Sequence, residues 1–79
     1  MSLSDIEKVV TSHLRDCYID KGYVNFYFKS NRLQLPFDNR VIGRVLKHGL
    51  ASKGLIELWS TERSNRVSVW KTCFNGGNI

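Results

Sequence analysis

The segment between Asp38 and Gly54 constrains the fold of this chain more than any other. Asp38 is a residue type that caps helix N-termini, and its charge suits the positive end of the helix dipole. The apolar residues that follow it recur at helical spacing, and they are Val41, Ile42, Val45, Leu46, Gly49 and Leu50. Gly54 closes the segment. The pattern predicts one helix, over about residues 38–53, that buries one of its faces.

Two alternating segments, residues 55–59 and 66–71, come directly after this predicted helix. Alternation is typical of a strand with one buried face, and the link over 61–65 is short and polar. We therefore predict a β-hairpin over about residues 55–72. Residues 23–28 are aromatic and β-branched, so we expect a short strand there that pairs with this hairpin.

A second amphipathic pattern lies near the start of the chain. Ser4 and Glu7 have the spacing of a capping box, and Gly22 is typical of a helix C-terminus. The apolar stripe between them consists of Ile6, Val9, Val10, Leu14, Cys17 and Tyr18. These features predict a helix over about residues 5–21.

A short helical segment is predicted over residues 30–34. Ser30 is its expected N-cap, and Pro36 ends it because the residue before a proline is pushed out of the helical region. The resulting order is helix, strand, short helix, turn, longer helix and hairpin. This order resembles the winged helix-turn-helix family over roughly residues 4–74, and the resemblance rests most on the part from Asp38 to Trp70.

The resemblance implies an α+β fold with three helices, a short strand and a C-terminal two-stranded wing. It implies one winged-helix domain over 1–74, similar to the small stand-alone domains of archaea and their viruses. The two glycines and two asparagines that follow predict a flexible tail over 75–79. The resemblance also implies a double-stranded DNA-binding protein that regulates transcription. The third helix (about 38–53) would enter the major groove, and the wing (about 55–72) would contact the backbone or the minor groove.

Composition supports a polyanionic partner without identifying it. The 79 residues carry a formal net charge of +5, which favours nucleic acid first and an anionic membrane surface second, although many soluble proteins are simply basic. A chain this short has no room for a deep catalytic cleft beside its core. We therefore expect no enzyme activity, no cofactor and no small-molecule substrate. The absence of a long apolar run or a signal-type N-terminus predicts a cytoplasmic protein without membrane contact.

The placement of cations sharpens this expectation. On an ideal helix that turns by about 100° per residue, Arg44 and Lys47 lie within about 40° and 20° of Arg40. Ala51 falls in the same row, and no acidic residue lies between Asp38 and Lys53. An ordinary solvated helix face would mix both signs of charge, so the single sign favours a DNA-contacting face, where Arg recognises guanine and Lys meets phosphate.

Two further groups complete the predicted interface. Arg63 and Arg66 lie at the hairpin turn, and Lys29, Ser30 and Arg32 lie at the start of the short second helix, an element end that can accept a phosphate. Asn39 lies at the start of the third helix and would reach a phosphate or support the cap. The predicted DNA-binding residues are Lys29, Ser30, Arg32, Asn39, Arg40, Arg44, Lys47, Arg63 and Arg66. Together they imply about five or six phosphate contacts and a log–log salt slope near −5.

The remaining candidate residues favour structural roles. His13 and Cys17 have a spacing that suits two metal ligands, but they lie on or near the apolar stripe, so we predict packing and no metal site. Cys17 and Cys73 can be free, bridged or buried. Trp59 and Trp70 are expected in the core or at a subunit interface, rather than as platforms for single-stranded bases.

Two other functions stay open at the level of sequence. Winged helices also serve as protein-interaction modules in transcription or replication assemblies, and RNA binding would depend on exposed aromatic rings rather than on the third helix. An exposed aromatic side of residues 23–28, together with the first helix, would form a homodimer surface.

Overall fold

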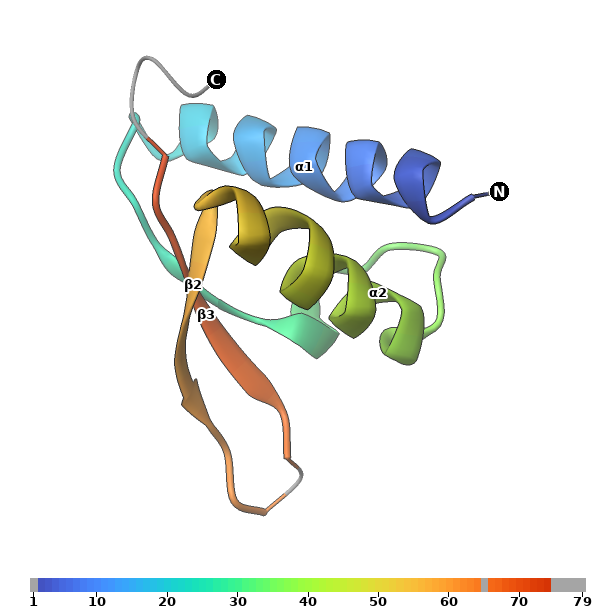
Figure 1. The fold of residues 1–79 in the computed structure, drawn as a ribbon. Helices are drawn as coiled ribbons and strands as arrows, with labels where there is room; N and C mark the ends of the chain where they lie inside the picture. The colour runs from blue at the N-terminus through green and yellow to red at the C-terminus, as the bar shows by residue number, and fades with distance from the viewer. Residues whose placement is uncertain (1, 65, 75–79) are drawn as a thin grey trace.

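The computed structural model describes residues 2–64 and 66–74, and in them it has two α-helices and a three-stranded antiparallel sheet (Figure 1). In chain order the elements are α1 (Leu3–Asp20), β1 (Tyr27–Lys29), the 3-10 turn η1 (Ser30–Arg32), α2 (Asn39–Val45), the π turn η2 (Leu46–Leu50), the 3-10 turn η3 (Ala51–Lys53), β2 (Ile56–Thr61) and β3 (Ser68–Thr72). The α+β class is confirmed. The predicted tail over 75–79 lies outside the described residues. No helix in the described part is long and apolar enough to cross a membrane.

The helix α1 is regular and is closed by local contacts at both ends. Its N-cap is Ser2, whose Oγ accepts a hydrogen bond from the Asp5 backbone N–H at 3.3 Å. The predicted cap at Ser4 is therefore wrong, because the same Ser-x-x-acid spacing occurs one half-turn earlier. At the other end, Gly22 has a φ of 77°, and the Tyr23 N–H donates to the Tyr18 carbonyl as in a Schellman motif.

The elements α2, η2 and η3 follow one another without a break, and we call residues 39–53 the composite helix. Its predicted limits are confirmed: the Asp38 side chain accepts from the Arg40 N–H at 2.7 Å, and Gly54 ends it with a φ of 76°. Its predicted regularity is wrong, because η2 is a π turn. Leu46 and Leu50 are both fully buried in that turn.

The prediction of three helices is wrong as well. The expected short helix over 30–34 is the single 3-10 turn η1, and Lys29 rather than Ser30 takes the N-cap position, with no side-chain hydrogen bond. Gln34 has a φ of 56°, and Pro36 follows two residues later. Too few residues therefore stay in the helical region to offset the cost of starting an α-helix.

In the sheet, β3 lies between β1 and β2, so β1 pairs with the predicted hairpin as expected. The expected strand over 23–28 is shorter, because Tyr23 is left-handed at the end of α1 and strand pairing begins only at Tyr27. The Phe26 N–H instead donates to Oγ1 of the buried Thr72 at 2.9 Å.

The two faces of the sheet differ sharply. Ile56, Trp70 and Thr72 are buried and define the inner face, which joins Leu46, Leu50 and α1 in the core. The composite helix lies between α1 and the hairpin (Figure 1). Trp70 is thus a core residue as predicted, whereas Trp59 is 58 % exposed. The ladder pairs Leu58 with Trp70 and Ser60 with Val69, so Trp59 is the extra residue of a β-bulge.

Candidate nucleic-acid interface

Several exposed cations lie along the composite helix. Arg40 and Arg44 project from α2 and Lys47 from η2, and all three side chains are exposed. Among residues 2–64 and 66–74, none of the three forms an ion pair with a carboxylate. Asn39 is exposed at the first position of α2, where Asp38 already supplies the cap. The charges of Arg40, Arg44 and Lys47 are therefore left unneutralised by the described acidic residues.

The structure divides the predicted row of cations between two concave surfaces. Arg40 and Arg44 lie with Leu3 in a hollow between α2 and the start of α1. Lys47 and Ala51 lie on the other side, in a hollow of about 470 Å³ that also borders the inner face of the hairpin near Leu58. On an ideal helix Arg44 and Lys47 fall on either side of Arg40, so the two hollows flank the predicted row of cations.

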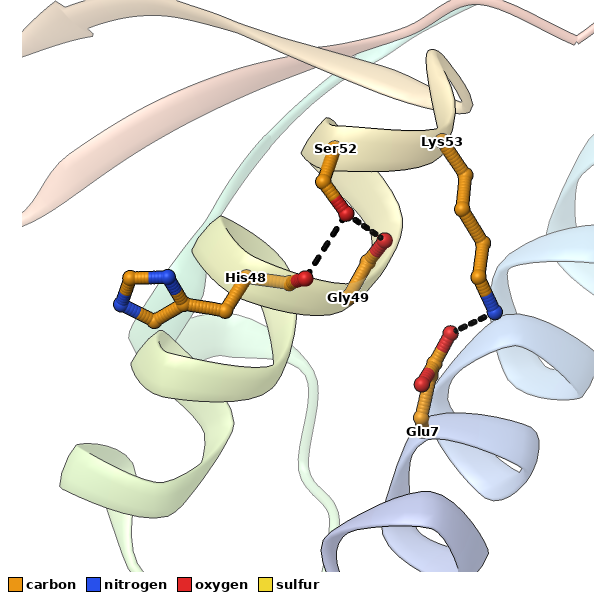
Figure 2. A network of polar contacts seen from close by, with 5 residues as sticks. All are labelled: Glu7, His48, Gly49, Ser52 and Lys53. Atoms are coloured by element: carbon orange, nitrogen blue, oxygen red, sulfur yellow. Dashed lines mark hydrogen bonds and ion pairs between the residues drawn. The ribbon is translucent and has the colours of Figure 1, made fainter.

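The π turn contains a close contact between the composite helix and α1. A Cβ on Gly49 would lie 2.9 Å from Cδ of Glu7, so a larger residue at this position would have to displace the Glu7 side chain. Figure 2 shows that Glu7 also forms an ion pair with Lys53 at the end of the composite helix. These two contacts hold the helix against α1 along its second half.

A serine stabilises the carbonyl groups at the end of this turn. The hydroxyl of Ser52 lies 2.7 Å from the His48 carbonyl oxygen and 2.9 Å from that of Gly49, and donates to them (Figure 2). Such bonds join a hydroxyl to backbone carbonyls one turn earlier in the helix. His48 itself is exposed and shares a hollow with Arg44 beside Glu7 and Gly49. The sequence prediction missed His48 as a member of this face, although its i+4 spacing from Arg44 is a usable signal.

The β2–β3 hairpin carries a second cationic group. It extends away from both helices (Figure 1), and Arg63 and Arg66 are exposed near its tip. The Glu62 N–H donates to the Val67 carbonyl at 2.8 Å, which closes the hairpin. Arg66 has a φ of 56°, a left-handed conformation that a non-glycine residue adopts at some cost.

The third predicted group is only partly available. Lys29 forms an ion pair with Glu62 of the hairpin, so its charge is balanced within the protein. Ser30 is half-buried in η1, and Arg32 is exposed. A three-residue 3-10 turn has no aligned dipole of the kind that binds a phosphate, so only the Arg32 charge and the Ser30 hydroxyl stay as candidates here.

The two cysteines are free thiols, which settles the alternatives that their spacing leaves open. Burial raises the pKa of the Cys73 thiol, the carboxylate of Glu57 adds to this increase, and Lys71 opposes it. Sγ of Cys17 lies 4.0 Å from Nε2 of His13. Within the described ranges, no three His, Cys, Asp or Glu side chains are grouped so as to hold a metal ion.

This chain matches no protein-family model, no curated protein and no solved structure. Its function therefore has to be argued from the site itself. Exposed Arg and Lys side chains on a helix, without acidic partners, can contact phosphates and base edges. The described surface is thus suited to bind a polyanion.

Proposed function

We propose that this chain binds double-stranded DNA and regulates transcription in the cytoplasm, as a small winged helix-turn-helix domain without catalytic activity. The observation that carries the proposal is the composite helix, whose exposed Arg40, Arg44 and Lys47 have no described acidic partner. In this proposal η1 takes the place of the middle helix, and the β2–β3 hairpin is the wing.

The dimensions of the composite helix suit a major groove. At a rise of about 1.5 Å per residue, residues 39–53 extend over roughly 22 Å, and a major groove about 12 Å wide accepts one helix. Arg40 and Arg44 would read guanine edges with their planar guanidinium groups, and Lys47 would meet a phosphate as a point charge. Asn39 would contact a phosphate at the entry of the groove.

The hairpin would add contacts outside the major groove. Arg63 and Arg66 are exposed on an element that projects from the body of the protein, so they would reach the adjacent backbone or a narrow minor groove. Arg32 would contact the backbone beside the composite helix. Because Lys29 is paired with Glu62, we expect it to contribute less to the affinity for DNA than an unpaired lysine would.

The proposal is tested by fluorescence anisotropy with a mixed-sequence duplex at several salt concentrations. Replacing Arg44 and Lys47 with Ala should remove most of the affinity and make the log–log salt slope shallower by about 1, because the lost Lys47 phosphate contact changes it by about 0.9, whereas Arg44 contacts a base edge. The matched control replaces Lys8 and Arg15, two exposed cations of α1, with Ala. This control lowers the net charge equally, but should leave the slope nearly unchanged.

Each alternative outcome has a definite meaning. An equal loss in both double variants would show that the chain binds DNA through its net charge and not through the composite helix. If the wild-type protein fails to bind duplex at low salt, the proposal is wrong, and a protein-interaction module becomes the leading function.

A further inference from the structure

The outer face of the sheet, opposite the core, presents two large aromatic side chains to solvent. Tyr27 of β1 and Trp59 of β2 are 53 % and 58 % exposed, and their ring centroids lie 5.0 Å apart. Lys71 of β3 lies between the two strands, with its Nζ 6.0 Å from the centre of the Trp59 ring. We call Tyr27, Glu57, Trp59, Val69 and Lys71 the aromatic face.

Strand alternation places Trp59 on this face. Leu58 points to the inner face, since it pairs with the buried Trp70, so the next residue, Trp59, points to the outer face, as does Glu57, which pairs with Lys71. The indole therefore lies on the side of the sheet that carries Tyr27 and Lys71, and the bulge leaves it without a directly opposed residue on β3. Two large aromatic side chains are thus exposed next to each other on one face of the sheet.

Charge on and beside the aromatic face is balanced, unlike that of the composite helix. Nζ of Lys71 lies 3.9 Å from Oε1 of Glu57, and Lys29 forms an ion pair with Glu62 at the margin. The face and its margin thus carry two cations and two carboxylates, joined in two ion pairs. A surface with both signs and an aromatic centre can pair with a copy of itself, because a two-fold axis that passes between Lys71 and Glu57 places each cation near the carboxylate of the partner.

We propose that the aromatic face binds a second copy of this chain, with Trp59 and Tyr27 at the centre of a two-fold symmetric interface. In the dimer, Lys71 of each copy faces Glu57 of the other. Trp and Tyr are the residues that most often dominate the binding energy of such interfaces. This association does not require DNA and therefore does not depend on the proposed function.

The size of the face sets the strength of the dimer. Three strands about 4.8 Å apart and about five residues long cover roughly 14 by 17 Å. The area of the face, about 240 Å², is far below the ~800 Å² per partner of a stable interface. The dimer is therefore weak, with a Kd in the micromolar range or above. The composite helix stays accessible in it, because that helix packs on the inner side of the sheet, next to Ile56 and Trp70.

Sedimentation equilibrium from about 10 µM to about 1 mM tests the proposal on the full chain. The mean mass of the wild-type protein should rise above the 9.1 kDa of the monomer as concentration increases. Trp59→Ala should weaken association by about tenfold or more. The control is Leu58→Ala, which removes a neighbouring side chain of similar exposure from the opposite face and should leave association unchanged.

A charge exchange provides a second, independent variant. Lys71→Glu brings carboxylates together across the two-fold axis and should weaken the dimer, and adding Glu57→Lys to it should restore the dimer. A wild-type protein that stays monomeric at the highest concentration would overturn the proposal, as would an equal effect of Leu58→Ala. If the protein stays monomeric but binds oligo(dT), and Trp59→Ala removes that binding, the face is a platform for single-stranded bases and the proposal is wrong.

Discussion

The two helical segments of this protein lie side by side and are built on opposite principles. The helix α1 is uniformly α-helical over Leu3–Asp20, whereas the composite helix changes from α to π to 3-10 within residues 39–53. The charged residues of α1 are of both signs, and they are Asp5, Glu7, Lys8, Arg15, Asp16 and Asp20. Between Asp38 and Gly54 the composite helix has only basic charged residues.

The difference shows which forces determine each segment. Local contacts close α1 at both ends, at Ser2 and at Gly22, so its form follows from its own residues. The middle of the composite helix is determined by its neighbours, because it must bury Leu46 and Leu50 while it passes Glu7 at close range. The irregular helix also carries Arg40, Arg44 and Lys47, exposed cations without a described acidic partner.

The largest effect is expected where burial holds the composite helix. Leu50 is fully buried, so Leu50→Ala should lower the free energy of unfolding by about 2–5 kcal/mol, through lost transfer energy and the cavity left behind. Urea denaturation followed by circular dichroism measures this loss. Leu58→Ala is the control, since Leu58 is 55 % exposed and its replacement should cost less than about 0.5 kcal/mol. Equal costs would contradict the view that burial determines this segment.

The next effect concerns charge rather than stability. Arg40→Glu should weaken duplex binding by roughly 5- to 150-fold, corresponding to about 1–3 kcal/mol for a lost bidentate base contact. Arg15→Glu on α1 makes the same change of charge on the helix with mixed signs and should weaken binding much less. Anisotropy titrations of both variants at one salt concentration provide the measurement. A similar loss of affinity in both variants would mean that the composite helix does not contact DNA more closely than α1 does.

A smaller effect tests the local closure of α1. Ser2→Ala removes the hydroxyl that accepts the Asp5 N–H and should cost about 1 kcal/mol. Ser4→Ala changes a residue inside the first turn and should alter stability by less than about 0.5 kcal/mol. Thermal unfolding measures the loss of stability in each variant. A larger loss for Ser4→Ala than for Ser2→Ala would show that Ser4 is the N-cap.

The same contrast explains what could be predicted from the sequence. Periodicity and turn residues predicted the α+β class, both limits of the composite helix and the hairpin, because these follow from Asp38, Gly54 and the alternating segments. The contact between Gly49 of the π turn and Glu7 joins residues that are far apart in the chain, so no local pattern predicts it. Alternation places Trp59 and Leu58 on opposite faces, but which face is buried depends on how the helices pack on the sheet, and the loss of Lys29 as a free cation depends on Glu62.

The smallest expected effect separates two glycines of the composite helix. A Cβ on Gly43 meets no atom within 4 Å, so Gly43→Ala should stabilise the protein by about 0.5–1 kcal/mol through helix propensity alone. A Cβ on Gly49 would come within 2.9 Å of Glu7 and has to displace a flexible side chain that pairs with Lys53. Moving Glu7 would weaken its ion pair with Lys53, and an exposed ion pair is worth about 0–1 kcal/mol. This cost offsets most of the gain in helix propensity at Gly49.

We therefore expect Gly49→Ala to change the free energy of unfolding by less than about 0.5 kcal/mol, below the gain at Gly43. Adding Glu7→Ala removes the obstructing side chain, so in that background the two glycine replacements should stabilise equally. Differential scanning calorimetry of the wild-type protein and these variants measures the difference. Equal gains with Glu7 present would mean that the approach of α1 does not constrain the π turn, and the irregularity of the composite helix would then have to come from the burial of Leu46 and Leu50 alone.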